Sequence, residues 1–211
     1  DNPDYFKRFM TNDAGLFLMV MILVFAGAGL IADDLKHNAL QLYFARPLRK
    51  KDYMLGKMAV IFFFVLILTL VPGLLLFVFK LIFAGSFKFF AAYPWLPLSI
   101  IGYSLVLTLF FAFYTLLLSA SSKNSRYVMV LIFMIYIFSD VLHGVLNNIF
   151  RSPYTALFSI KGNLQQAGAF IFGQKLPFAV PVVWSFVVLA AVCGVSLVVL
   201  NRTTRGVEVI K

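Results

Sequence analysis

The stretch MAVIFFFVLILTLVPGLLLFVF, residues 58–79, decides the fold class. It carries no charge over 22 residues, and a helix needs about 20 apolar residues to cross a hydrocarbon core of about 30 Å. Pro72 and Gly73 predict a kink within it. Four other apolar stretches have a similar length: residues 14–32, 96–119, 127–146 and 178–200. All five are too uniformly apolar for barrel strands, which alternate. The sequence predicts an all-α integral membrane protein, a polytopic helical bundle, with residues 1–211 as a single transmembrane domain.

Composition agrees with this class. Of the 211 residues, 62% are hydrophobic and 12% are charged, whereas a water-soluble domain has about a quarter charged residues. A water-soluble enzyme is therefore excluded. The net charge of +10 would suggest nucleic acid in a soluble protein, but here the bases flank apolar spans, and no nucleic-acid partner is expected. The lone Cys193 excludes an intramolecular disulfide.

The basic residues predict the orientation, because cytoplasmic loops of membrane proteins are enriched in Lys and Arg. Residues 33–57, 121–126 and 201–211 fall on one side of the predicted bundle and hold eleven of the 18 bases: Lys36, Arg46, Arg49, Lys50, Lys51, Lys57, Lys123, Arg126, Arg202, Arg205 and Lys211. We expect this side, with the C-terminus, to be cytoplasmic. Five visible spans then start outside, which predicts a sixth, cytosol-starting span upstream of Asp1. A cleaved signal peptide is the alternative.

Residues 144–177 form a long segment on the outer side. Its apolar patches are interrupted by Arg151, Pro153, Lys161 and Gly162, so it cannot span the membrane. Such a segment fits short interfacial or re-entrant helices that pack against the bundle before the last span.

The loop of residues 33–57 reads DDLKHNALQLYFARPLRKKDYMLGK. Asp33 and Asp34 end the first span, and apolar side chains then recur at helical spacing: Leu35, Ala39, Leu42 and Tyr43. Pro47 disfavours the α conformation at Arg46, so the predicted amphipathic helix ends there. From these residues alone, a helix lying on anionic lipid and a helix that binds a partner are both open.

The same loop resembles the one between the second and third spans of ABC-2-type ABC transporter permeases. The matching elements are Asp34, Asn38-Ala39-Leu40, Leu42, Arg46-Pro47 and Leu55-Gly56-Lys57, and the tail of residues 205–209 is similar to the short cytoplasmic tail of that family. The resemblance implies a coupling helix that docks on an ABC ATPase subunit through Asp34, Leu35, Lys36, Ala39, Leu42, Tyr43, Arg46 and Pro47.

The resemblance also implies a dimer with a second permease copy or paralogue, in a bacterial inner membrane, that exports a substrate. ATP and Mg²⁺ would bind the partner ATPase, with no cofactor on this chain. The sequence agrees, because Gly56-Lys57 is followed by Met58 and lacks the spacing of a phosphate-binding loop. His37 and His143 lie in no HExxH motif, so this chain is not expected to be an enzyme by itself.

Asp140 stands within the fourth span, where an ionised carboxylate costs about 2.5–3.5 kcal/mol at the bilayer centre. His143 and Asn147 follow at i+3 and i+7 and so share its helical face. This face is either part of a translocation path or gate, or a structural hydrogen-bond patch against the outer segment. The expected partners of Asp140 are His143 or polar groups of the outer segment such as Asn163 and Gln165.

The sequence thus predicts the transmembrane subunit of an ATP-driven exporter. Two other functions stay open. One is a membrane anchor or assembly subunit of an ABC-like complex that does not transport. The other is an ion-coupled carrier that uses Asp140.

Overall fold

The computed structural model describes residues 4–39, 50–83 and 88–205. All regular elements in these ranges are helical, as predicted. In chain order they are α1 (Asp4–Met10), α2 (Asp13–Gly27), α3 (Gly29–Lys36), α5 (Lys50–Phe83), α6 (Lys88–Ala92), α7 (Leu96–Ala120), α8 (Ser125–Phe150), the 3₁₀ helix η1 (Pro153–Phe158), α9 (Ile160–Ile171) and α10 (Val182–Arg205). Five helical stretches are long and apolar enough to cross a membrane: Arg8–Lys36, Lys51–Phe83, Leu96–Ala120, Ser125–Phe150 and Val182–Thr203.

Short polar residues fix where several helices begin. The side-chain oxygen of Asn12 accepts a hydrogen bond from the Ala14 amide at the start of α2, 3.2 Å away. Asn124 does the same for α8, and Ser159 for α9. These caps satisfy amides that have no partner inside the helix. Ser159 stands at the end of the segment between α8 and α9, so its cap fixes where the outer segment turns into α9.

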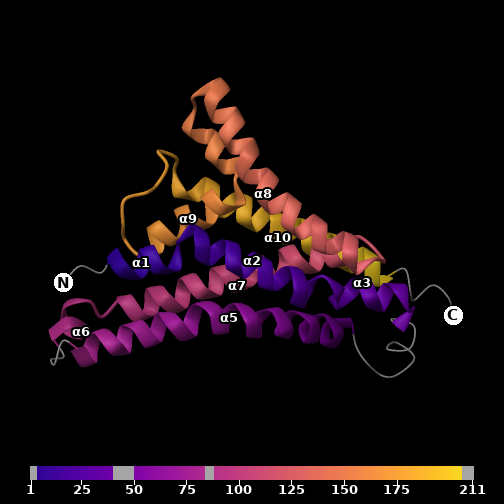
Figure 1. The fold of residues 1–211 in the computed structure, drawn as a ribbon, viewed down its shortest axis with the longest axis horizontal. Helices are drawn as coiled ribbons and strands as arrows, with labels where there is room; N and C mark the ends of the chain where they lie inside the picture. The colour runs from indigo at the N-terminus through magenta and orange to yellow at the C-terminus, as the bar shows by residue number, and fades with distance from the viewer. Residues whose placement is uncertain (1–3, 40–49, 84–87, 206–211) are drawn as a thin grey trace.

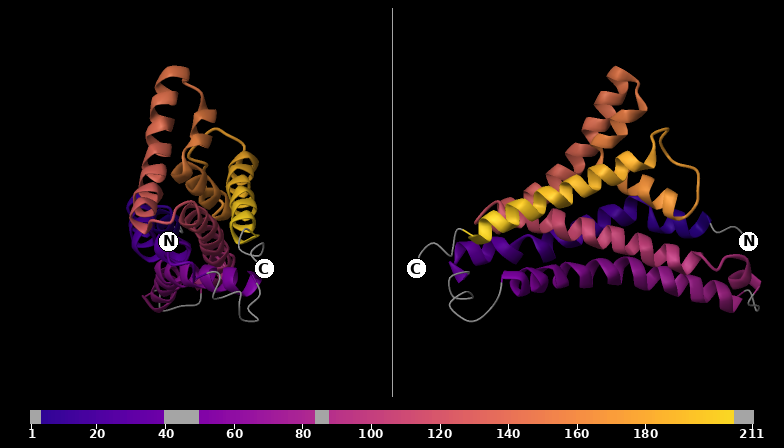
Figure 2. Two further views of the ribbon diagram at one scale, coloured as in Figure 1. Left: turned by 90° about the vertical axis from the view of Figure 1, so that its right-hand side faces the viewer. Right: turned by 180° about the vertical axis from the view of Figure 1, so that it is seen from behind.

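The helix α7 forms the centre of the bundle. It packs against α5 along one side and against α10 along another, while α3, α8 and α9 also contact it. Its most apolar stretch is 61% buried, against 17% for α8 and for α10. α8 starts beside α3 and leans away from α5 and α7 toward its C-terminal end (Figures 1 and 2). One side of α8 and one side of α10 are therefore left to face lipid or another chain.

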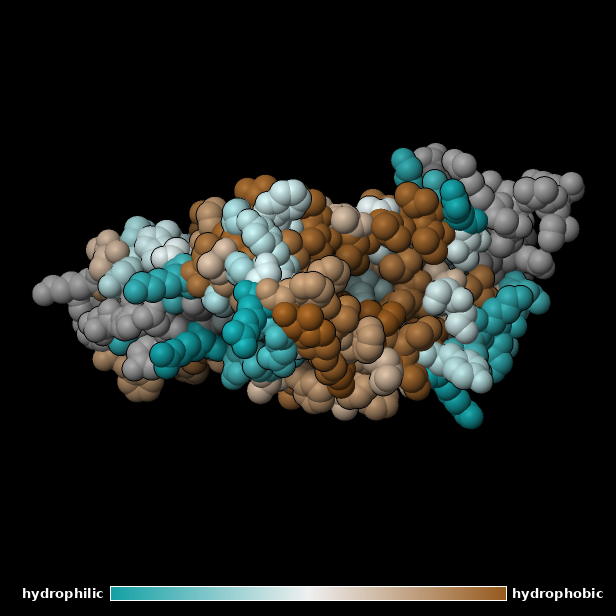
Figure 3. Space-filling view, turned by 90° about the horizontal axis from the view of Figure 1, so that it is seen from above, coloured by the Kyte–Doolittle hydropathy of each residue, from teal (hydrophilic) through white to brown (hydrophobic). Residues whose placement is uncertain are grey.

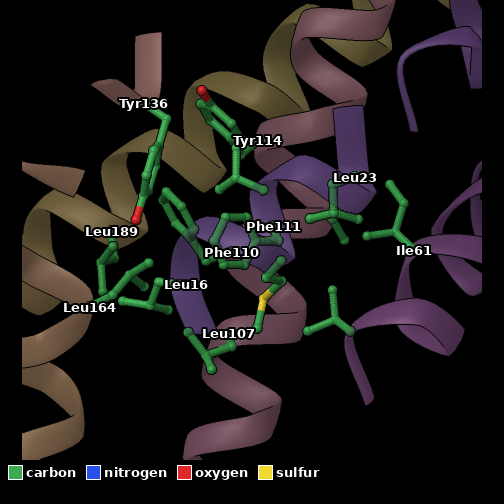
Figure 4. Close-up of a cluster of buried hydrophobic side chains, with 14 of the residues drawn as sticks. Leu16, Leu23, Ile61, Leu107, Phe110, Phe111, Tyr114, Tyr136, Leu164 and Leu189 are labelled. Atoms are coloured by element: carbon green, nitrogen blue, oxygen red, sulfur yellow. The ribbon is translucent and has the colours of Figure 1, made fainter. Parts of the chain in front are cut away.

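The buried core follows α7 from one end to the other. Phe110, Phe111 and Tyr114 lie in its middle and make ring contacts with one another. Leucines of α2, α9 and α10 close around them, with Ile61 of α5 on the far side (Figure 4). The surface seen from above is mostly apolar along the middle of the molecule, and polar residues gather toward its two ends (Figure 3). This distribution is that of a membrane-spanning bundle.

The helix α5 is 34 residues long, which corresponds to about 50 Å. It continues through Pro72, so the proline does not break the helix. Gly73 faces the neighbours of α5, because a Cβ there would meet the Ile100 side chain at 2.8 Å and Met10 at 3.3 Å. The pair therefore serves the close approach of α5 to α1 and α7.

The ends of the helices fall into two groups (Figure 1). The end of α3, the start of α5, the end of α7, the start of α8 and the end of α10 lie together, and we call this the loop end of the bundle. α1, α6, the start of α7 and α9 lie at the opposite end, which we call the outer end. Each group holds the loops that the basic residues had assigned to one side of the membrane.

Candidate functional site

The first span, predicted over residues 14–32, lies within the helical stretch Arg8–Lys36, which has a local irregularity at Ala28 close to the loop end although Ala28 keeps helical backbone angles. α2 ends at Gly27 and α3 begins at Gly29. The Ser119 hydroxyl of α7 accepts hydrogen bonds from the Ile31 amide at 2.8 Å and the Ala32 amide at 3.1 Å. It donates one to the Ala28 carbonyl, also at 2.8 Å. A side chain that inserts among the backbone hydrogen bonds of a helix in this way is a known cause of a kink. We call it the Ser119 joint.

The joint depends on close approach between helices. A Cβ at Gly27 would overlap the Thr115 methyl group of α7. Ala28 and Ser119 are both fully buried. Because this site is buried, the three hydrogen bonds satisfy backbone groups that water does not reach.

We expect Ser119→Ala to lower the free energy of unfolding by about 1–3 kcal/mol, because it leaves a buried amide or carbonyl without a partner. Ser121→Ala is the matched control, since its hydroxyl is exposed and bonds only the Leu118 carbonyl in the preceding turn. Thermal unfolding of the purified protein in detergent measures both. Equal melting temperatures for the two variants would contradict the role of the joint.

A second contact ties together the two ends of the loop of residues 33–57. The Lys57 ammonium lies 2.7 Å from Asp34 Oδ2, and the Tyr53 hydroxyl donates to the same oxygen at 2.8 Å. Lys57 also lies over the Tyr53 ring, 5.4 Å from its centre. The Asp34 and Lys57 side chains are only 14% and 20% exposed, so this pair is screened less than a surface ion pair. We call Asp34, Tyr53 and Lys57 the loop clamp.

The amphipathic helix predicted from Leu35 onward does not run through the next turn. α3 ends at Lys36 with His37 as its cap, and Asn38 has a left-handed backbone with φ of 51°. Asn tolerates this conformation better than most residues, so the sequence allowed a stop there. The prediction that Leu35 and Ala39 share one helical face was therefore wrong.

The expected coupling residues accordingly divide into three groups. Asp34 is part of the loop clamp, and Leu35 packs against the core. Lys36 is exposed and Ala39 is half-buried. The remaining four lie outside the described residues: Leu42, Tyr43, Arg46 and Pro47.

At the outer end, three charged side chains meet from three helices. The Lys161 ammonium of α9 lies 2.9 Å from Asp140 Oδ2 of α8 and 3.7 Å from Asp13 Oδ2 of α2. The Ser159 hydroxyl donates to Asp140 Oδ1 at 3.0 Å. Gln165 of α9 reaches the other Asp13 oxygen, Oδ1, at 2.6 Å. We call Asp13, Asp140 and Lys161 the outer triad.

The charge of the triad is uneven. Burial by itself would lower the pKa of Lys161, but hydrogen bonds and charge attraction from Asp140 and Asp13 outweigh it and raise the pKa above its ordinary value. Lys161 is therefore a cation at neutral pH, facing two carboxylates. One negative charge is left in excess.

His143 and Asn147 do not join the triad, although they share a helix with Asp140. The His143 ring stands edge-on to Phe178, with centroids 5.6 Å apart, and its Nδ1 is buried with no hydrogen-bond partner among the described residues. Asn147 Oδ1 accepts a 3.4 Å hydrogen bond from the Thr155 hydroxyl. Both thus face the outer segment.

The predicted partners of Asp140 are corrected by these contacts. Asp140 does bind polar groups of the outer segment, but they are Lys161 and Ser159 rather than Asn163 and Gln165, and it does not bind His143. The Asn163 amide donates to carbonyls of its own segment, Leu157 and Ser159. The Asn163 side-chain amide finds backbone carbonyls within its own segment, so it does not need the Asp140 carboxylate.

A pocket of about 360 Å³ opens beside the triad. Its polar lining consists of Asp13, Asp140, Lys161 and Tyr136, and its apolar lining of Ala14, Phe17, Ile137 and Val141. No group of three or more His, Cys, Asp or Glu in the described ranges is arranged to hold a metal ion.

The sequence reasoning missed Lys161, Asp13, Tyr136 and Ser119 as site residues. A signal existed for Lys161, because a carboxylate within a span needs a compensating charge, and only Arg151, Lys161 and Lys175 lie in the outer segment. No pattern marked Ser119, because its role depends on which residues of another span lie opposite.

Five membrane-length helical stretches, with α7 at their centre, make this a polytopic helical membrane protein. The family model described as ABC-2 family transporter protein matches residues 2–140, more than half of the chain. The chain belongs to this family, and it is a transmembrane permease subunit of the ABC type, a transport component rather than a catalytic subunit. A comparison with curated proteins gives no match.

Proposed function

We propose that this permease subunit exports its substrate across a bacterial inner membrane, driven by ABC ATPase subunits that dock on residues 33–57. ATP and Mg²⁺ bind those partner subunits. A second permease copy or a paralogue completes the translocation unit. The loop end, with the C-terminus, faces the cytoplasm, because it carries most of the basic residues.

The single observation that carries the proposal is the loop clamp. Asp34 at the end of the first span holds Tyr53 and Lys57 at the start of α5, so both sides of the loop are fastened to one point. The Ser119 joint fastens the same region to α7, the centre of the bundle. A push on the loop would therefore reach α2, α5 and α7 together, which is what coupling to an ATPase requires.

The outer triad gives further support to the proposal. Asp140 lines a pocket and also holds α9 to α8, so a substrate that competes for this carboxylate would loosen the outer end. Asp140 is the residue we place on the translocation path. We assign His143 and Asn147, the other two residues of the predicted path, to packing of the outer segment, since their contacts lie there.

The clamp gives the test. With Asp34→Asn and Tyr53→Phe together, we expect the ATPase subunits still to copurify, but substrate-stimulated ATP hydrolysis to fall on the order of tenfold, because hydrogen bonds to a charged group are worth about 1.5–3 kcal/mol. Lys123→Gln, a change of charge on an exposed residue at the same end but outside residues 33–57, should leave the stimulation unchanged. Undiminished stimulation in the double variant would refute coupling through the clamp.

The same assay separates the alternative functions. An anchor or assembly subunit would bind the ATPase without any substrate stimulation. An ion-coupled carrier would transport in proteoliposomes that contain this chain alone, driven by an ion gradient and without ATP.

A further inference from the structure

We propose that the pocket beside the outer triad binds a lipophilic organic monocation, a molecule with one positive charge on an apolar body. This inference rests on the proposed function, because it names the class of substrate for the exporter. Three features of the pocket favour such a ligand: its charge, the buried Tyr136 in its lining and its apolar walls.

The first feature is the charge of the pocket. Asp13 and Asp140 face one Lys161, so the pocket has one negative charge in excess. Asp13 is 67% exposed and Asp140 is 39% exposed, whereas Lys161 is 23% exposed. The carboxylates are thus more accessible to a ligand than the ammonium group. A monocation would neutralise the site, while an anion would have to approach two carboxylates.

The second feature is Tyr136. The residue lines the pocket and is only 4% exposed, yet its hydroxyl has no hydrogen-bond partner among the described residues. Figure 4 shows the ring at the edge of the core cluster, near Leu164 of α9 and Leu189 of α10. A buried tyrosine hydroxyl usually finds a partner. Because the hydroxyl oxygen itself is inaccessible from the pocket, Tyr136 would offer a bound cation its ring.

The third feature is the apolar lining of the pocket. Phe17, Ile137, Val141 and Ala14 make one side of the pocket apolar. Phe17 and Val141 are also exposed, at 42% and 55%, on helices whose outer surface faces lipid. A ligand with an apolar body could therefore enter from the bilayer. The rings of Phe17 and Tyr136 add cation–π attraction, and about 360 Å³ is within the usual size of small-molecule sites.

Tetraphenylphosphonium and tetraphenylborate are the probes, because they share a shape and differ in the sign of charge. Saturable binding of each is measured on the purified chain in nanodiscs without any ATPase, with empty nanodiscs subtracted. We expect tetraphenylphosphonium to bind and tetraphenylborate not to bind. Equal binding of both ions, or no saturable binding of the cation, overturns the proposal.

Three variants locate the site. Asp13→Asn with Asp140→Asn should weaken tetraphenylphosphonium binding at least tenfold. Val141→Trp should also weaken it at least tenfold by filling the pocket without changing its charge, and it guards against a folding defect in the charge variant. Arg8→Gln alters the charge at the same end on an exposed residue and should have no effect. Unchanged binding in Val141→Trp would place the cation elsewhere.

The outcomes separate this proposal from the proposed function. If the cation binds with these variant effects but ATP does not move it across the membrane of proteoliposomes that also hold the ATPase, the pocket stands and the export proposal fails for this ligand class. If ATP-driven transport of another compound occurs while tetraphenylphosphonium does not bind, the exporter stands and the pocket assignment fails.

Discussion

Leu42→Asp with Tyr43→Asp is expected to remove the ATPase subunits from the purified complex while the bundle stays folded. Both residues belong to the apolar side chains that the sequence places in the coupling loop, and neither lies in a predicted span. Two buried interface side chains of about 2 kcal/mol each correspond together to a loss of affinity on the order of a thousandfold. Affinity purification of the permease, followed by quantification of the ATPase, measures the effect.

Lys123→Asp is the control for this prediction. Lys123 is exposed in the short connection between α7 and α8, at the same end of the bundle. The substitution therefore places a new carboxylate at that end without changing the coupling loop. It should retain the ATPase. Full copurification with the Leu42 and Tyr43 variant would show that the docking surface lies elsewhere.

The second large effect is expected at Asp140. Asp140→Asn keeps a side-chain oxygen that can accept from Lys161 and Ser159, and it removes the charge. If Asp140 lies on the translocation path, transport should fall by roughly 10- to 100-fold, because a hydrogen bond to a charged group is worth about 1.5–3 kcal/mol. Assembly with the ATPase should be normal. Transport assays in proteoliposomes, with Arg8→Gln as the charge control, measure this.

Asp140→Leu separates path from packing. Leucine cannot bind Lys161 or Ser159, so the half-buried Lys161 keeps only Asp13, at 3.7 Å. We expect a loss of stability of about 1–3 kcal/mol in this variant and not in Asp140→Asn. Wild-type transport by Asp140→Asn, together with a lower melting temperature for Asp140→Leu, would leave Asp140 with a packing role alone.

The five long helices were predictable because each carries its own signal. An apolar stretch of about 20 residues needs no partner to be recognised, and residues 96–119 match α7 closely. The described helix ends that flank these basic loops also lie together at one end of the structure (Figure 1). For the same reason, the short helices of the outer segment could be expected but not bounded, since their interrupted apolar patches define no fixed length.

The contacts between helices could not be predicted from the sequence. The Ser119 joint requires knowing that α7 faces the Gly27–Gly29 region, and hydroxyl groups in apolar helices usually bond their own preceding turn. The triad requires Asp13, Asp140 and Lys161 to be near one another, although they lie far apart in the chain. Helical periodicity relates residues on one element, so it placed His143 and Asn147 beside Asp140 and gave no information about α2 or α9.

The central claim is that residues 33–57 contact an ATPase subunit and respond to its nucleotide. The most direct test is photo-crosslinking in membranes that contain both proteins, with Tyr43→p-benzoylphenylalanine in the permease. Trp95→p-benzoylphenylalanine, an exposed aromatic position at the opposite end, is the matched control. We predict a crosslinked product with the ATPase at position 43 whose yield changes when ATP is added, and none at position 95. Absence of that product at position 43, or its appearance at position 95, would contradict the account.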